Sequence, residues 1–94
     1  MKSFGGFSTI GIREDGYYST AEHHWLIRPQ DEWETRNAGQ WLEIGGSGVD
    51  GISWALRRDE EGVFAHYPIE DRFEWKAKDV ESLIAGWFSG QITV

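Results

Sequence analysis

Residues 41–67, WLEIGGSGVDGISWALRRDEEGVFAHY, give the strongest β-sheet pattern in this chain. The stretch holds apolar and aromatic segments at 41–44, 52–58 and 63–67, separated by loops rich in glycine and acidic residues. Short runs of this kind, bounded by turn residues, are typical of β-strands. We therefore predict consecutive strands, the last two joined as a hairpin through residues 59–62, with Gly62 where a positive φ is needed.

The hairpin also predicts which side chains share a face of the sheet. With Arg58 opposite Val63, Trp54 lies opposite Tyr67. One face then carries Ile52, Trp54, Leu56, Val63, Ala65 and Tyr67, and we expect this face to be the core. The other face carries Ser53, Ala55, Arg57, Phe64 and His66.

Residues 80–89 predict the clearest helix. Apolar residues recur there at the helical period, at Val80, Leu83, Ile84, Trp87 and Phe88. Asp79 is a suitable N-cap and Gly90 a suitable C-terminal cap. Gly86, inside the helix, costs about 1 kcal/mol relative to alanine, so the helix must be stabilised by packing. Residues 91–94 after it predict a short terminal strand.

The remaining segments give weaker patterns. Residues 7–13 and 17–20 predict a hairpin, and 24–27 and 73–75 predict two further strands. Pro29 suits the first position of a single helical turn running to Glu34. Together these elements predict one domain over residues 1–94, of the α+β class. It would consist of a small, mostly antiparallel sheet with the C-terminal amphipathic helix packed on it.

Composition bounds the class of function. The 94 residues contain six tryptophans and no cysteine, and the formal net charge is −7. Binding to nucleic acid depends on lysine and arginine contacts to phosphate, so direct binding to DNA or RNA is disfavoured. The same charge suits a basic protein partner. No run approaches the roughly 18 apolar residues of a membrane span, and a cytoplasmic location is the simplest expectation.

Motifs that would indicate catalysis or a cofactor are weak. Residues 46–51 fit G-x-G-x-x-G, but a dinucleotide site needs a helix after this motif and the sequence predicts a strand. Residues 45–52 fit one copy of a calcium-binding β-roll repeat, which works only when stacked. His23 and His24 are adjacent and would point to opposite faces of a strand. No nucleophile and base can be paired, so we expect no enzyme, no metal and no cofactor.

The order of these features resembles the SMI1/KNR4 (SUKH) superfamily. A glycine- and aspartate-rich loop at 45–51 precedes an apolar strand, the strand 63–67 ends in His66-Tyr67-Pro68, and a helix closes the domain. Residues 24–33, a strand running into a turn with Pro29 and Trp33, are similar to the stretch upstream in that family. The chain lacks the N-terminal helices of typical members. The resemblance implies an α+β binding domain. Many bacterial members are immunity proteins of toxin systems, and no catalytic residue can be carried over.

Non-catalytic protein binding is the function expected from these observations, most simply an immunity-type or regulatory protein that neutralises a basic toxin such as a nuclease. The alternatives are a phage or mobile-element inhibitor of a host nucleic-acid-binding complex, a minor enzyme, and a subunit of a homo-oligomer with aromatic residues at its interface. Trp33 and Trp75, flanked by charge, are expected to be partly exposed. The candidate partner-binding residues are Trp33, Arg57, Asp59, Glu60, Glu61, Phe64 and His66.

Overall fold

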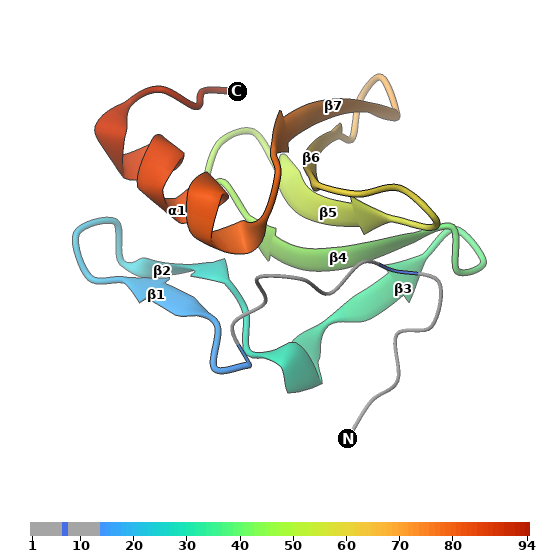
Figure 1. The fold of residues 1–94 in the computed structure, drawn as a ribbon, viewed down its shortest axis with the longest axis horizontal. Helices are drawn as coiled ribbons and strands as arrows, with labels where there is room; N and C mark the ends of the chain where they lie inside the picture. The colour runs from blue at the N-terminus through green and yellow to red at the C-terminus, as the bar shows by residue number, and fades with distance from the viewer. Residues whose placement is uncertain (1–6, 8–13) are drawn as a thin grey trace.

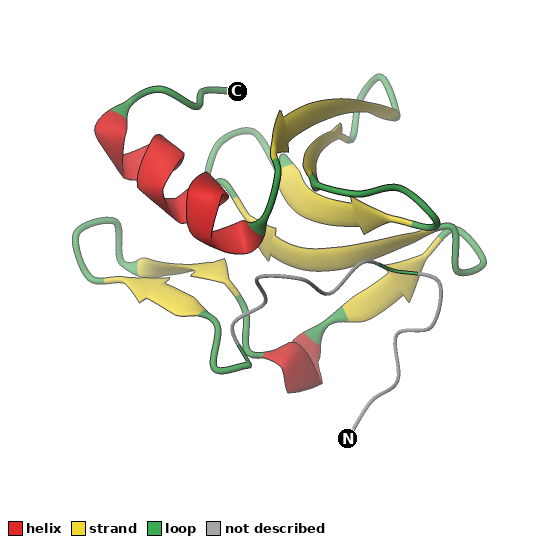
Figure 2. Cartoon of the chain, viewed as in Figure 1, coloured by secondary structure: helices red, strands yellow, loops and turns green. Residues whose placement is uncertain are grey.

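The computed structural model of the chain describes Phe7 and residues 14–94 (Figure 1). In chain order the elements are β1 (Tyr17–Ser19), β2 (His24–Ile27), the 3-10 turn η1 (Gln30–Glu32), β3 (Glu34–Arg36), β4 (Trp41–Gly46), β5 (Ser53–Arg57), β6 (Val63–Tyr67), β7 (Arg72–Ala77) and α1 (Val80–Ser89). The strands form one seven-stranded sheet in which the assigned pairs are antiparallel. Among the described residues, one α-helix follows the last strand (Figure 2). The predicted α+β class is confirmed.

β4 organises the sheet. β5 pairs with it along one edge, and the other edge is shared by β3, which pairs at Trp41–Glu43, and β2, which pairs at Gly45. The order along the sheet is β1-β2-β4-β5-β6-β7. Gly45 allows β2 to approach this closely, because a Cβ atom there would lie 2.9 Å from the Cα of Ile27.

The predicted hairpin of β5 and β6 is present, but its register differs by two residues. Trp54 pairs with Ala65 and not with Tyr67, because Arg58 belongs to the turn and not to the strand. Since side chains alternate with a period of two, a shift by two leaves every residue on its predicted face. The turn uses positive φ at Asp59 (62°) and at Gly62 (102°), as expected for the glycine.

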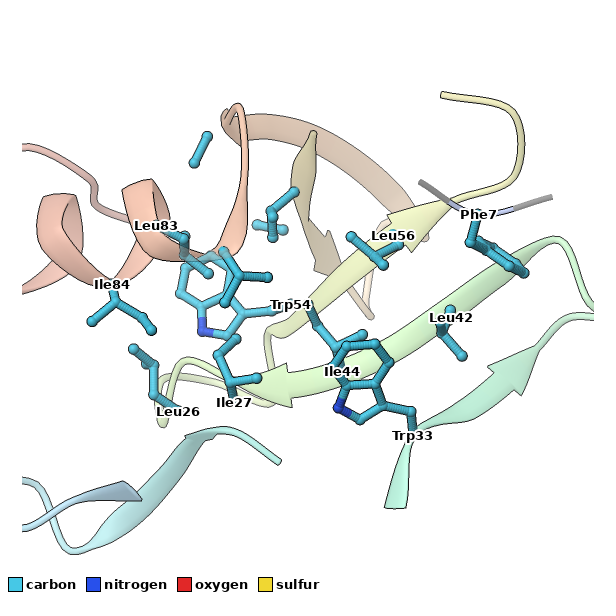
Figure 3. Packing of buried hydrophobic residues seen from close by; sticks show 14 of the residues in the cluster. Phe7, Leu26, Ile27, Trp33, Leu42, Ile44, Trp54, Leu56, Leu83 and Ile84 are labelled. Carbon is cyan, nitrogen blue, oxygen red and sulfur yellow. The ribbon is translucent and has the colours of Figure 1, made fainter. Parts of the chain in front are cut away.

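The main core lies between the sheet and α1 (Figure 3). Trp54 is fully buried at its centre and meets the ring of Trp87 edge-on, with 5.5 Å between ring centroids. Other buried members of this core come from β2, β4, β5, β6 and the helix: Leu26, Ile27, Leu42, Ile44, Leu56, Val63, Val80 and Leu83. The helix is capped as predicted, because the Asp79 carboxylate accepts a hydrogen bond from the backbone N–H of Ser82 (2.7 Å) and Gly90 has φ 81°.

The predicted terminal strand at 91–94 is wrong. The backbone N–H of Ile92 donates to the carbonyl of Gly86 (3.0 Å), so the chain turns back onto the helix instead of joining the sheet. A Cβ atom at position 86 would lie 2.7 Å from Cγ1 of Ile92. Gly86 therefore provides the space in which the terminal segment packs.

The region before β4 departs furthest from the predictions. The helical turn expected over residues 29–34 is confined to η1, and β3 follows it at once. The residues of β3 are all exposed and show no apolar alternation.

Trp33, which we expected to be partly exposed, is buried in the core at 1% exposure. Its indole Nε1 donates to the carbonyl oxygen of Arg28 (2.7 Å). β1 pairs with β2, and the predicted strand over residues 7–13 lies outside the described residues except for Phe7.

Within the described part of the chain, no helix is long and apolar enough to cross a membrane.

Candidate functional site

The face of the sheet opposite the main core carries its own aromatic cluster, which we call the second face. It consists of Trp41, Ala55, Arg57, Phe64, His66 and Phe73, contributed by β4, β5, β6 and β7. Cross-strand pairing aligns these residues, since Trp41 is opposite Arg57 and Phe64 is opposite Ala55. His66 and Phe73 are directly opposite each other in β6 and β7. Paired side chains on one face lie close enough to interact.

The aromatic rings of the second face contact one another across the strands. The imidazole of His66 stacks on the indole of Trp41, with 4.4 Å between centroids and 30° between ring planes. Phe73 meets the same indole edge-on at 5.5 Å and lies 4.9 Å from the His66 ring. Phe64 is edge-on to Phe73 at 6.5 Å. Phe73 therefore lies at the centre of the cluster, in contact with all three other rings, and it remains half-buried.

Arg57 covers part of this cluster. Its guanidinium carbon lies 4.5 Å from the centroid of Phe73 and 5.6 Å from that of Phe64, which is cation–π geometry. A guanidinium nitrogen is also 3.3 Å from the carboxylate of Glu60 in the turn after β5. The arginine thus connects the aromatic cluster to the acidic turn.

His66 is connected in the same way to the opposite end of the hairpin. Its Nε2 lies 2.8 Å from Oδ1 of Asp71, in the turn between β6 and β7. Asp71 has φ 51° and an exposed side chain, and Glu70 beside it is exposed as well. Successive antiparallel hairpins turn at opposite ends of their common strand. The second face is therefore flanked by Asp59-Glu60-Glu61 at one end of β6 and by Glu70-Asp71 at the other.

A polar network anchors the strands beside the aromatic cluster. Glu43 in β4 accepts hydrogen bonds from Arg28 (2.7 Å), Arg36 (3.0 Å) and the hydroxyl of Ser53 (2.8 Å). Burial by itself would raise the pKa of Glu43, but the hydrogen bonds from Arg36, Ser53 and Arg28 outweigh it and the pKa is lowered. The network cross-links β3, β4 and β5 to the segment after β2, so its role is to fix the sheet.

Most of the predicted site residues lie on or beside the second face. Arg57 and His66 both contact Phe73, and Glu60 pairs with Arg57 from the β5–β6 turn, in which Asp59 and Glu61 are exposed. Phe64 belongs to the cluster but is only 7% exposed, so it supports the surface and offers little area to a partner.

Trp33 has to be withdrawn from the candidates. It is buried in the main core, away from this cluster. Charged residues flank it in the sequence, but they lie at exposed positions of η1 and β3, and their exposure does not predict the burial of the indole between them.

Two contributors to the second face were missed. Trp41, which is buried (8% exposed), and Phe73 are not among the candidate residues named from the sequence, yet they carry most of the ring contacts. Phe73 could have been found from the sequence. It lies in the predicted strand that follows the Pro68 turn, and antiparallel pairing of that strand with β6 places it opposite His66. The sequence carries no such signal for Trp41, because its position beside His66 depends on the register in which β4 pairs with β5.

Metal binding finds no geometric support among the described residues. In residues 14–94 and at Phe7 no group of three or more histidine, cysteine, aspartate or glutamate side chains could hold a metal ion. The glycine loop at 47–52 joins β4 to β5 and uses positive φ at Gly48 (78°) and Gly51 (72°). A strand follows it, as predicted, so the helix that a dinucleotide site needs is not at this position.

Comparison with known proteins adds no relative: no family model matches the chain, and no curated protein or solved structure matches it. The resemblance to the SUKH superfamily therefore stays a prediction.

Proposed function

We propose that this protein is a non-catalytic binding protein that recognises a basic protein surface through the second face and its acidic turns. We further propose that its role is of the immunity type, the neutralisation of a basic toxin such as a nuclease. The immunity role derives from the resemblance to the SUKH superfamily. The binding role derives from the residues themselves.

One observation carries the binding role: half-buried Phe73, with Arg57 and His66 beside it, lies between two exposed acidic turns. Protein interfaces combine an aromatic and arginine-rich centre with a polar rim, and a few central residues supply most of the binding free energy. The acidic turns supply that rim. Their charge would steer a basic partner to the surface and raise its association rate at low salt.

Capture from a lysate of the native organism, at low salt and with the tagged full chain as bait, identifies the partner. We expect a single small basic protein. A large host complex that binds nucleic acid would instead support the phage-type inhibitor. The captured partner is then purified and its affinity is measured by calorimetry.

The interface is tested by reversing the charge of the β5–β6 turn. Glu60→Lys/Glu61→Lys should weaken binding by about 10-fold or more, with most of the effect in the association rate. The matched control is Asp31→Lys/Glu32→Lys, which makes the same charge change at exposed positions of η1. Phe73→Ala should weaken binding mainly by faster dissociation. Equal losses in both double variants would mean that only net charge matters, and unchanged affinity in Glu60→Lys/Glu61→Lys would remove this turn from the interface.

A further inference from the structure

β7 (Arg72–Ala77) leaves one edge of the sheet open. It pairs with β6 along one side, and no described residue pairs with its other side. The strand at the far end of the sheet, β1, is only three residues long, whereas β7 has six. The free N–H and C=O groups of an edge strand of this length form a template for another strand.

The charges on β7 indicate which kind of strand could pair with its free edge. Arg72, Glu74 and Lys76 alternate in sign along one side of the strand. The Glu74 carboxylate contacts both cations, Lys76 at 3.0 Å. The strand therefore presents a plus–minus–plus row.

A second copy of β7, running antiparallel, is complementary to this row. When the two-fold axis passes through Phe73 or Trp75, Glu74 of one copy lies opposite Arg72 or Lys76 of the other. When the axis passes through Glu74, the two Glu74 carboxylates oppose each other and Arg72 opposes Lys76. Unlike charges directly opposite stabilise a strand pair and like charges destabilise it, so the charges favour the registers centred on an aromatic residue.

The apolar surface beside the free edge of β7 also favours a second copy of the chain as the partner. Trp75 is 57% exposed, and it lines a groove between β7 and α1 together with Ala77, Ala85 and Ile92. Pairing two copies of β7 about Trp75 would bring the two indoles to the dyad, and pairing about Phe73 would bring the two Phe73 rings there. Either register removes apolar area from water. Aromatic residues are enriched at such interfaces.

We propose that this chain forms a symmetric dimer by antiparallel pairing of β7 with β7 of a second copy. The β6–β7 register shift lies at the Trp75–Ala77 end of the strand, so Arg72 to Trp75 remain regular. An edge of six residues buries less than the roughly 800 Å² per partner of a standard interface. The dimer is therefore of the weak, transient class. It continues the sheet across both copies and brings Phe73 of the second face, which lies on β7, close to the seam between them.

Sedimentation equilibrium of the full chain, from about 1 µM to 1 mM, tests the proposal over the concentrations at which a weak dimer would form. Wild type should pass from monomer to dimer. Glu74→Lys turns the row all-positive and should raise the dissociation constant at least 10-fold. Arg72→Glu/Glu74→Lys/Lys76→Glu inverts every charge, restores the complementarity and should restore the dimer.

Two further variants separate loss of pairing from loss of folding, and circular dichroism reports the fold of each. Trp75→Lys removes an exposed side chain and puts a lysine on the edge, so it should fold and remain monomeric. Tyr18→Lys makes a comparable change at a 44% exposed residue of β1, on the other edge, and should still dimerise. Wild type that stays monomeric at 1 mM overturns the proposal. So does a folded triple variant that fails to dimerise, or a dimer that Tyr18→Lys dissociates and Trp75→Lys does not.

Discussion

The indole of Trp41 and the imidazole of His66 stack with 4.4 Å between centroids, although β5 separates the strands that carry them. Trp41 is paired with Arg57 and His66 with Ser53, so the two rings approach each other diagonally across β5. Ala55 is midway between those partners, points to the same face and is fully buried. Its small side chain leaves the room in which the rings meet.

Enlarging Ala55 should therefore separate these rings. Ala55→Leu inserts three carbon atoms under the cluster, and overpacking of this kind costs about 1–3 kcal/mol. Urea unfolding should show this loss of stability, and binding of the captured partner should weaken as well. Ala85→Leu makes the same change at an exposed position of α1 and should alter the free energy of unfolding by less than about 0.5 kcal/mol. Equal stability of the two variants would contradict the packing described.

The neighbouring glycines at the end of β4 should respond differently to alanine. At Gly45 a Cβ atom would collide with the backbone of β2, at Leu26 and Ile27, which cannot move aside cheaply. Gly45→Ala should cost about 2–3 kcal/mol. At Gly46 a Cβ atom would meet nothing within 4 Å, and φ is not positive. Gly46→Ala should be neutral or slightly stabilising, because alanine restricts the unfolded chain. Chemical denaturation gives the free energy of unfolding of both variants. Equal changes in the two would mean that β2 does not approach Gly45.

The Glu43 network should make stability depend on pH. The pKa of Glu43 is lowered in the folded protein, so its contribution is present above the ordinary glutamate pKa and is lost as the pH falls through the lowered value. Glu43→Gln should lose about 2 kcal/mol at pH 7, since it weakens the charge-assisted hydrogen bonds of Arg28 and Arg36.

That difference from wild type should shrink as the pH falls from the ordinary glutamate pKa through the lowered pKa of Glu43, because the wild-type carboxyl group then becomes protonated too. Glu61→Gln, an exposed position with no contact to the network, is the control for the general effect of removing a carboxylate. A constant difference between Glu43→Gln and wild type across this range would mean that the ionised form of Glu43 is not what holds the network.

Gly86 and Ile92 should show strong coupling. Gly86→Ala alone gains helix propensity of about 1 kcal/mol but forces the Ile92 side chain away from the helix, so we expect a net loss of stability. In an Ile92→Ala background the space is open, and Gly86→Ala should stabilise by up to about 1 kcal/mol. Thermal or urea unfolding of the four proteins of this double-mutant cycle gives the coupling free energy. Additive effects would contradict the packing of Ile92 on Gly86.

Only features governed by neighbours in the chain could be predicted from the sequence. The helix α1 begins after Asp79 and ends before Gly90 as predicted, because its caps and its apolar stripe are all set within a few turns. The face assignment of β5 and β6 also held, because a register error of two residues does not change which side of the sheet a residue occupies.

Tertiary structure decided the rest. The exposed strand β3 exists only because β4 supplies its hydrogen-bonding partners, and the indole of Trp33 is buried only because the main core lies beneath it. The segment 91–94 folds onto Gly86 and forms no strand, although its apolar residues suit either arrangement. The stacked pair of Trp41 and His66 needs both strands in place over Ala55. Such contacts join residues far apart in the chain, and the local sequence carries no signal for them because the free energy that fixes them comes from burial and pairing between elements.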